Sequence, residues 1–158
     1  MAKETLHTYE STVRWTGNTG VGTADYQSYK RDYIISAPQK TDIPGSSDPA
    51  FRGDPGRYNP EDLLVSSLSA CHMLWYLHLC AQAGVVVVDY CDHATGIMQE
   101  TPGGSGSFVE VTLHPVVTVT DPAMTEIALE LHKKAKEYCF IANSVNFPVR
   151  HDPRVESI

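Results

Sequence analysis

The sequence lacks several features that would assign it to a common class of protein. It has no cluster of lysines or arginines, and its 19 acidic residues outnumber its 12 basic residues, which gives a formal net charge of −7. Nucleic acids and anionic membranes attract basic surfaces, so neither is expected to be the main partner. No run approaches the ~18 apolar residues of a membrane span, and residues 1–5 lack the apolar segment of a signal peptide. We therefore expect a cytoplasmic protein.

Paired cysteine motifs are also missing. None of the four cysteines stands in a C-x-x-C pattern, so a zinc ribbon or a thioredoxin motif is not expected. In a reducing compartment the thiols are expected to be structural, catalytic or metal-binding rather than a disulfide scaffold. There is no internal repeat, and 158 residues with 42% hydrophobic content fit one domain over residues 1–158.

One long helix is predicted over residues 59–84. Asn59 is a favourable N-cap, Pro60 suits the first helical position, and Gly84 is a typical residue after a helix end. Beyond Asp62, apolar residues cover most of the helix circumference, which predicts a helix buried inside the protein. Cys71 lies halfway along this helix.

The remaining segments predict a mixture of strands and one further helix, hence an α+β protein. The clearest strand is 108–119, whose apolar residues alternate with polar ones, and Pro115 within it suggests an edge position or a bulge. An amphipathic helix follows Pro122 and delivers Cys139 near its end, with Ile127, Leu131, Ala135 and Tyr138 at helical spacing. Further strands are expected within residues 6–16, 29–36, 85–93 and 146–150.

Two segments are expected to have no regular structure. Residues 37–58 contain several prolines and glycines without periodicity, and loops of this length are often functional. This loop carries Arg52 and Arg57 directly ahead of the cysteine helix, so it is a candidate active-site loop. Residues 151–158 are expected to form a tail.

Cys71 has two interpretations. Burial alone would raise the pKa of its thiol and leave it inert, and it lies too far from the helix N-terminus to benefit from the dipole. A nucleophilic Cys71 would need a cation from elsewhere in the chain, for which Arg52 is the natural donor, with Glu61 to orient it. Each unit of pKa depression requires ~1.4 kcal/mol of preferential thiolate stabilisation.

The other cysteines and nearby histidines have simpler interpretations. Cys80 lies about 180° around the helix from Cys71 and is expected to be a core residue. His72 and His78 are expected to be packed or hydrogen-bonded, because neither is placed to activate Cys71 directly. Cys91 stands in a D-x-C-x-H pattern, a weak hint of metal binding that lacks a fourth ligand.

Residues 59–63 and 70–71 resemble the N-P-E-x-L … A-C signature of the OsmC/Ohr family of peroxide-reducing proteins. Residues 135–139, with 141–145 after them, resemble the family's second helix, which ends in its second cysteine. The order of strands, cysteine helix, strands and second helix also agrees, so the resemblance covers most of the chain.

The resemblance implies an OsmC-like α+β fold with antiparallel sheets, the long helix at the centre, and an intertwined homodimer. It also implies a peroxidase in which Cys71 reacts with an organic hydroperoxide, or with hydrogen peroxide, and Cys139 resolves the product to a disulfide. Arg52 and Glu61 match the family's active-site arginine and glutamate, with Arg57 as an alternative. A dithiol reductant, such as a lipoylated protein, would recycle the disulfide, and no cofactor is implied.

Three further expectations accompany this resemblance. Phe51, Trp75 and Tyr138 are candidates for an apolar pocket, although core packing would also explain them. The fold could instead serve a non-enzymatic, stress-associated binding protein. It could also serve a redox sensor whose disulfide changes its partners.

Overall fold

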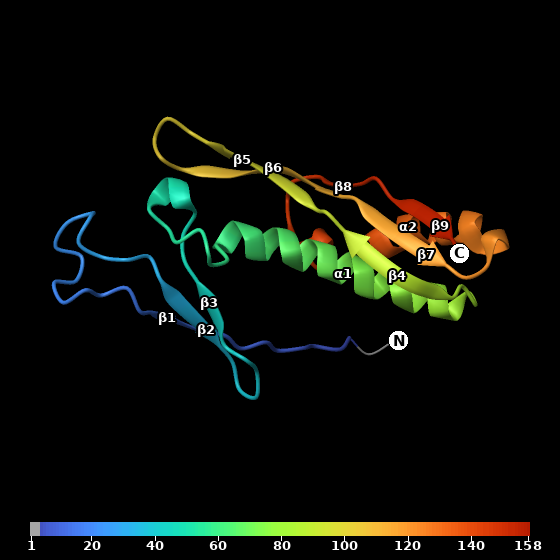
Figure 1. The fold of residues 1–158 in the computed structure, drawn as a ribbon, viewed down its shortest axis with the longest axis horizontal. Coiled ribbons are helices and arrows are strands. Elements are labelled where there is room, and N and C mark those ends of the chain that lie inside the picture. Colours follow the sequence, from blue (N-terminus) through green and yellow to red (C-terminus); the bar gives the residue numbers. More distant parts are fainter. Residues whose placement is uncertain (1–3) are drawn as a thin grey trace. The chain divides into compact units, whose positions relative to one another are not determined.

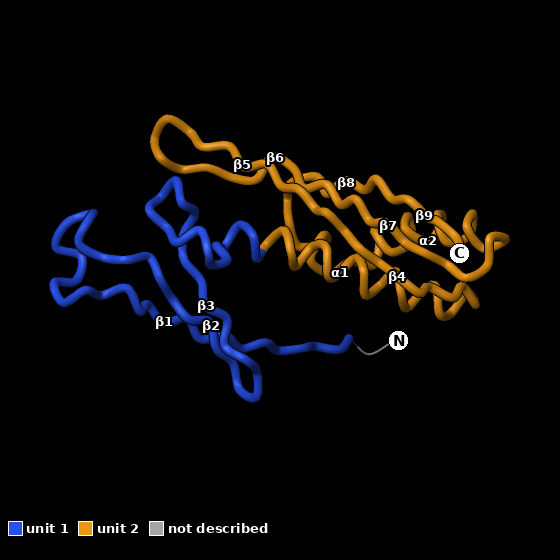
Figure 2. Tube along the Cα trace, in the orientation of Figure 1, with its two compact units in different colours: residues 1–63 blue, residues 64–158 orange. Residues whose placement is uncertain are grey.

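The computed structural model describes residues 4–158, which fall into two compact units (Figure 1 and Figure 2). The first unit ends at Leu63 and the second runs from Leu64 to Ile158. The boundary lies in the first turn of helix α1 (Pro60–Gln82), the long helix expected from the sequence.

The first unit contains one antiparallel sheet of order β1-β2-β3. Its strands are β1 (Thr12–Trp15), β2 (Tyr33–Ser36) and β3 (Ile43–Gly45). The first two confirm the strands expected near these positions. Among residues 4–63 no hydrophobic side chain is buried, so this sheet has no apolar core of its own.

The segment 37–58 is more ordered than its composition suggested, which corrects the expectation of a structureless loop. It contains strand β3 and a 3-10 turn, η1 (Pro49–Phe51). The Asp48 carboxylate caps this turn by accepting a hydrogen bond from the backbone N–H of Ala50 at 2.7 Å. An aspartate directly before a proline was the local signal for this turn.

Helix α1 begins and ends where its sequence predicts. The Asn59 side chain accepts a hydrogen bond from the Asp62 N–H at 2.8 Å, and the Asp62 carboxylate accepts one from the Asn59 N–H at 3.1 Å, a reciprocal cap. At the other end Gly84 adopts φ +73°, and Val85 N–H donates to the Cys80 carbonyl at 2.9 Å. Both helix ends are therefore fixed by local hydrogen bonds.

The second unit holds two three-stranded sheets (Figure 1). One has the order β4-β7-β9 and the other β5-β6-β8. The β6–β8 and β7–β9 pairs are parallel, so the sheets are mixed rather than purely antiparallel, although the α+β class is confirmed. The strands are β4 (Val87–Asp92), β5 (Thr95–Glu100), β6 (Gly106–Leu113), β7 (Pro115–Val119), β8 (Val149–His151) and β9 (Arg154–Ser157).

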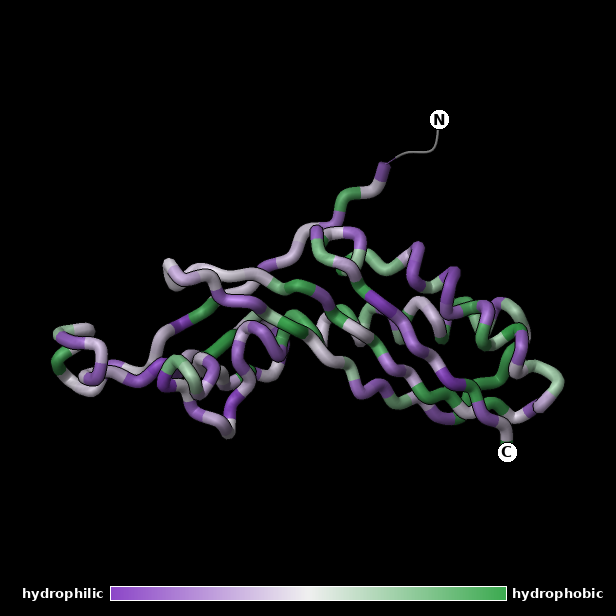
Figure 3. Tube along the Cα trace, turned by 90° about the horizontal axis from the view of Figure 1, so that it is seen from above, coloured by the Kyte–Doolittle hydropathy of each residue, from purple (hydrophilic) through white to green (hydrophobic). Residues whose placement is uncertain are grey.

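The expected strand 108–119 is two strands in two different sheets. β6 ends at Leu113 and β7 begins at Pro115, and the alternation of buried and exposed residues runs unbroken across the junction. Figure 3 shows this alternation of hydrophobic and hydrophilic segments along the strands of the unit. The expectation of an edge strand or bulge at Pro115 is wrong: the residue opens the central strand of its sheet, a position where the missing N–H is tolerated.

The expected tail at 151–158 is also wrong. Residues 154–157 form β9, which pairs in parallel with β7 from Val116 to Val119. This pairing joins segments about forty residues apart in the chain, and no local pattern encodes it.

Helix α2 (Thr125–Tyr138) follows a 3-10 turn, η2 (Pro122–Met124), as expected. Its buried face agrees only in part with the expected one: Ala135 is buried and Leu131 packs against the core, but Ala128 and His132 are also buried, whereas Ile127 is 46% exposed and Tyr138 44%. The buried residues of α2 are therefore two alanines and one histidine, and the spacing of large hydrophobic residues does not reveal this face.

Two apolar clusters support the second unit. The first joins Tyr76, Leu79 and Cys80 of α1 to β7 and to the small residues of α2. The second joins Leu68 of α1 to Val111 and other residues of the β5-β6-β8 sheet. By length and mean hydropathy α1 would also be able to cross a membrane, a property that it shares with the core helices of soluble proteins.

Candidate functional site

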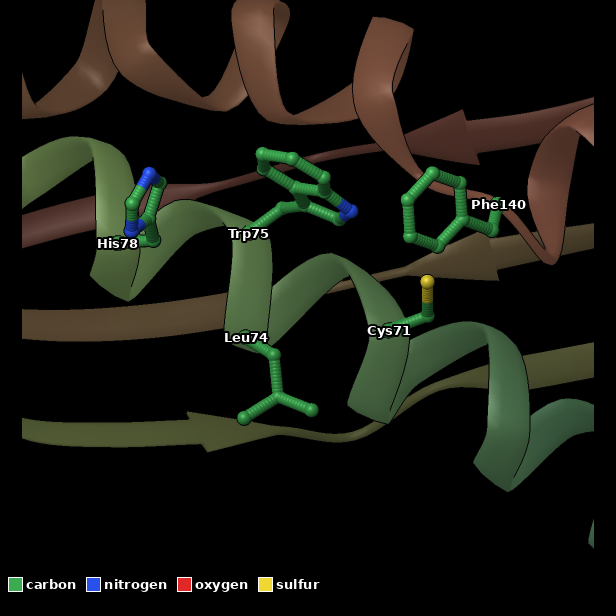
Figure 4. Close-up of a pocket in the computed structure, with 5 residues that line it drawn as sticks. All are labelled: Cys71, Leu74, Trp75, His78 and Phe140. Carbon is green, nitrogen blue, oxygen red and sulfur yellow. The ribbon is translucent and has the colours of Figure 1, made fainter. Parts of the chain in front are cut away.

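Cys71 lies on the more open face of α1, where it lines a cavity of about 300 Å³. Its thiol is half-buried, and Figure 4 shows the sulfur directed toward the ring of Phe140. The other lining residues are Leu74, Trp75 and His78 of α1 and Phe140. Cys71, Leu74, Trp75 and His78 follow the spacing of one helix face, so the helix itself builds this wall.

Aromatic rings surround the centre of this cavity. The Trp75 ring lies 5.1 Å from that of Tyr138, 5.5 Å from that of Phe140 and 5.7 Å from that of His78, between ring centroids. Such contacts favour edge-on or tilted geometry and hold the rings in place. The cavity therefore offers an apolar surface beside a thiol.

Cys139 immediately follows α2 and is 1% exposed. Its sulfur accepts a hydrogen bond from the Ala142 N–H at 3.4 Å, and Cys71 is near enough to influence its ionisation. Burial and, to a smaller extent, the neighbouring Cys71 thiol raise the pKa of Cys139 to about 11, against the lowering effect of backbone N–H groups. At neutral pH Cys139 is thus a protonated, covered thiol, and Cys71 is the member of the pair that faces the cavity.

The predicted residues Arg52 and Glu61 belong to the first unit, and their roles toward the thiols remain predictions. Within that unit the two candidate arginines differ. Arg57 pairs with Asp54 at 3.5 Å and with Asp32 at 4.0 Å. The Arg52 guanidinium lies 5.9 Å over the Tyr26 ring and forms no ion pair among residues 4–158. Of these two arginines, Arg52 is therefore the one without an ion pair among residues 4–158.

The remaining cysteines have the environments expected from the sequence. Cys80 is 1% exposed in the apolar core, where burial raises the pKa of its thiol. Cys91 is exposed, with its sulfur 3.7 Å from His93 Nε2. No three histidine, cysteine or acidic side chains converge as metal ligands anywhere in residues 4–158, so the D-x-C-x-H pattern does not form such a site.

Sequence reasoning missed several residues around the site. Leu74 and Phe140 line the cavity without having been predicted, and His78 faces it rather than packing elsewhere. The i, i+3, i+4, i+7 spacing from Cys71 was the available signal for the α1 residues. Trp75 lines the cavity as expected, Tyr138 contacts the Trp75 ring without lining the cavity, and Phe51 belongs to the first unit.

His72 is buried, as expected, and its ring contacts two other histidines that no motif indicated. His72 Nε2 lies 3.0 Å from His132 Nδ1, and the His72 ring centroid is 4.4 Å from that of His151. These side chains come from three separate elements, so only the fold brings them together.

The fold and the site define an α+β protein in which two helices bring a cavity-facing thiol and a buried thiol together. The sequence model described as OsmC-like protein matches residues 53–153, which is more than half of the chain. The chain therefore belongs to the OsmC-like protein family, as its cysteine motifs indicated.

Solved structures agree with this assignment. An OsmC-like protein of unknown function from Vibrio cholerae is 29% identical, with a TM-score of 0.83 over 94% of this chain and 99% of that one. An organic hydroperoxide resistance protein from Elizabethkingia anophelis is 18% identical, with a TM-score of 0.69 over 99% of this chain and 100% of that one. That of Bacillus subtilis is 19% identical, with a TM-score of 0.61 over 96% and 100%.

At the lower identities, what these proteins share with this chain is the fold. No curated protein matches this sequence significantly.

Proposed function

We propose that the protein is a thiol-dependent peroxidase that reduces organic hydroperoxides, with hydrogen peroxide as a further substrate. The observation that carries this proposal is the placement of Cys71 in an apolar cavity, near the buried Cys139. An apolar cavity suits the organic part of a hydroperoxide, and a thiol at its wall suits attack on the peroxide bond. Two structural neighbours are organic hydroperoxide resistance proteins, which is consistent with this chemistry.

The first step is attack by Cys71. Its thiolate bonds to the distal oxygen of the hydroperoxide, the O–O bond breaks, and the proximal oxygen takes up a proton and leaves as an alcohol. Cys71 is oxidised to a sulfenic acid. The exposure of Cys71 and the burial of Cys139 favour this order of roles.

The second step is condensation of the two cysteines. Cys139 attacks the sulfenic sulfur, its proton leaves with the hydroxyl group as water, and a Cys71–Cys139 disulfide forms. A dithiol reductant then restores both thiols and is itself oxidised to a disulfide. We propose a lipoylated protein of the cytoplasm as the source of this dithiol.

Activation of Cys71 requires a cation, because burial by itself opposes ionisation. We propose that Arg52 supplies it and that Glu61 orients the guanidinium. Arg52 suits this role because a guanidinium stays charged and can bind a thiolate and a carboxylate together. The ion pairs of Arg57 with Asp54 and Asp32 make it the weaker candidate.

We further propose that the working molecule is a homodimer. The first unit carries large exposed apolar side chains, among them Leu6 at 92% and Val13 at 65% exposure, and it buries no apolar side chain among residues 4–63. Small sheets without a hydrophobic face against a partner are marginally stable in water. Light scattering coupled to size-exclusion chromatography is expected to give twice the 17.4 kDa chain mass, and a monomer would exclude this assembly.

A steady-state assay tests the proposed reaction. With cumene hydroperoxide and excess dihydrolipoamide, the wild-type protein is expected to consume many equivalents of peroxide. A redox sensor would consume one equivalent and then stop, and a binding protein would consume none. Either of these results would refute the peroxidase.

The role of Cys139 is tested separately with Cys139→Ser. This variant is expected to complete the first step and then accumulate Cys71 as sulfenic or sulfinic acid, because no thiol condenses with it. Intact mass should show the added oxygen. A variant that turns over like the wild type would show that Cys139 is not the resolving cysteine.

A further inference from the structure

A second cavity lies in the same unit, away from the two thiols. It measures about 410 Å³, within the size range of small-molecule sites. Its lining residues come from α2 and from the segment that includes β8: Leu129, Glu130, His132, Lys133, Lys136, His151 and Pro153. It shares no lining residue with the cavity of Cys71.

Three histidines meet at the base of this cavity. His72 and His132 are 0% and 2% exposed, and their rings are stacked with centroids 5.3 Å apart. The His151 ring centroid lies 4.4 Å from that of His72. The His132 ring also stacks on the Tyr76 ring, with centroids 3.8 Å apart, so His132 is held firmly.

The hydrogen bonding of this cluster is incomplete. Three rings carry six nitrogens, and the bond between His72 Nε2 and His132 Nδ1 uses two of them. His72 Nδ1 and His132 Nε2 are buried without a partner, and the His151 ring has only a loose contact with the Val149 backbone, so at least one of its two nitrogens is also free. Buried polar atoms almost always have a partner, so the two rings that line the cavity point to something that binds there.

These rings offer hydrogen-bond donors. Burial lowers the pKa of His72 to about 3 and those of His132 and His151 to about 4, so all three are neutral at pH 7. A neutral imidazole carries one N–H and one acceptor nitrogen. If His72 Nε2–H donates to His132 Nδ1, then His132 must carry its proton on Nε2, where it is free to donate.

The cavity also carries one positive charge that nothing balances. Lys133 is paired with Glu130 at 2.8 Å, whereas Lys136 forms no ion pair within residues 4–158. After burial, the charge of Lys136 is the largest influence that lowers the pKa of His151. The Asp92 carboxylate has the opposite effect and raises the pKa of His151. This carboxylate already accepts hydrogen bonds from the Ser69 hydroxyl and from the His114 N–H.

We propose that this cavity is a binding site for a small oxyanion, a phosphate or a carboxylate, held by N–H groups of His132 and His151 and by the Lys136 ammonium. Two neutral donors beside one unbalanced cation match an anion that carries several acceptor oxygens. The site takes no part in the proposed peroxide reaction, so either proposal can fail without the other.

Histidine side-chain NMR tests the site directly. Protein labelled with ¹⁵N at histidine is titrated at pH 7 and constant ionic strength with inorganic phosphate and, separately, with acetate. Saturable shifts are expected at the ring nitrogens of His132 and His151, with His132 protonated at Nε2. His78 and His114 should not shift. Saturation by only one of the two anions would identify the ligand as a phosphate or as a carboxylate.

Two matched lysine variants check the charge. Lys136→Gln is expected to weaken anion binding roughly fivefold, as loss of a partly exposed charge partner typically does. Lys134→Gln removes the same charge from the same helix at a position that does not line the cavity, and binding should be unchanged. Shifts that grow linearly without saturation, or equal effects of the two variants, would overturn the proposal.

Discussion

The two faces of helix α1 both carry a cysteine and a histidine, but one face is open and the other is buried. The open face carries Cys71, Leu74, Trp75 and His78, and the buried face carries Leu68, His72, Tyr76, Leu79 and Cys80. Each face therefore carries one cysteine and one histidine, and the two faces differ in how far these side chains are buried. On the open face Cys71 lines a cavity near a second thiol, whereas on the buried face Cys80 is 1% exposed and borders a different cavity that no second thiol lines.

The difference shows that residue type alone does not decide what a thiol can do here. Burial raises the pKa of the Cys80 thiol, and the cavity that Cys80 borders has no other cysteine in its lining. Cys71 is only half-buried, and its sulfur points toward Phe140, which lines the same cavity, so a peroxide in that cavity has a route to the sulfur. Substitutions on each face, and in the residues that surround it, test this difference.

The first prediction compares the two cysteines of α1 by substitution. Cys71→Ser should lower peroxidase turnover by about three orders of magnitude or more, because the nucleophile is lost. Cys80→Ser removes the same thiol from the other face and should retain nearly full turnover. The measurement is kcat/KM for cumene hydroperoxide. If folded Cys80→Ser loses activity, or if Cys71→Ser keeps it, then Cys71 is not the nucleophile that the comparison of the two faces indicates.

The second prediction concerns His72, on the buried face of α1, and His132 of α2, which contacts it. Their pKa values in the folded protein lie below the ordinary value of 6.5, so the unfolded chain binds more protons and stability falls as the pH falls from about 6.5 toward 4. His132 alone should account for about 2 kcal/mol of this loss, roughly thirtyfold in the folding equilibrium. His132→Gln should reduce the pH dependence by that amount.

Urea unfolding at pH 7.0 and pH 4.5, in buffers without phosphate, measures this effect. His114→Gln is the matched control, since His114 is 40% exposed and pairs with Asp152 at the surface. The control should show the pH dependence of the wild type. If the free energy of unfolding of His132→Gln changes between pH 7.0 and pH 4.5 as much as that of the wild type, then His132 is already protonated or is exposed to solvent in the folded protein.

The third prediction tests whether the Cys71 thiolate needs a cation from outside helix α1. Arg52→Gln should lower kcat/KM roughly tenfold, the effect of losing about 1.4 kcal/mol of thiolate stabilisation. Arg57→Gln removes a guanidinium already held by Asp54 and Asp32, and it should stay within about twofold of the wild type. The reverse order of effects would assign the role to Arg57.

The fourth prediction addresses the aromatic wall of the cavity. Phe140→Ala removes apolar surface beside Cys71, and it should lower kcat/KM for cumene hydroperoxide about fivefold with little change for hydrogen peroxide. Ile127→Ala, which shortens an exposed side chain of α2 outside the cavity, serves as the control. Equal losses for both peroxides would show that the ring supports the thiols rather than the substrate.

The sequence predicted those parts of the structure that are encoded locally. Asn59, Pro60 and Gly84 set the ends of α1, and the position of Cys139 followed from the periodicity of α2. Alternation correctly identified the buried residues between Val111 and Val119. It did not reveal the break at His114, because the same alternation continues when the chain passes from one sheet to the other.

The parts that were missed depend on contacts between distant segments. β9 exists because β7 offers a free edge, and residues 154–157 alone carry no strong strand signal. The buried face of α2 was only partly predicted because Ala128 and His132 are less hydrophobic than the exposed Ile127. The histidine cluster draws on α1, α2 and β8, so no single stretch of sequence could indicate it.

The central claim is that Cys71 and Cys139 act as a pair while Cys80, on the other face of the same helix, takes no part. Peptide mapping by mass spectrometry after one equivalent of cumene hydroperoxide tests this most directly, with free thiols alkylated before digestion. The account predicts a Cys71–Cys139 disulfide, with Cys80 and Cys91 recovered as alkylated thiols. A disulfide that includes Cys80 or Cys91, or a Cys71 that remains a free thiol, would contradict it.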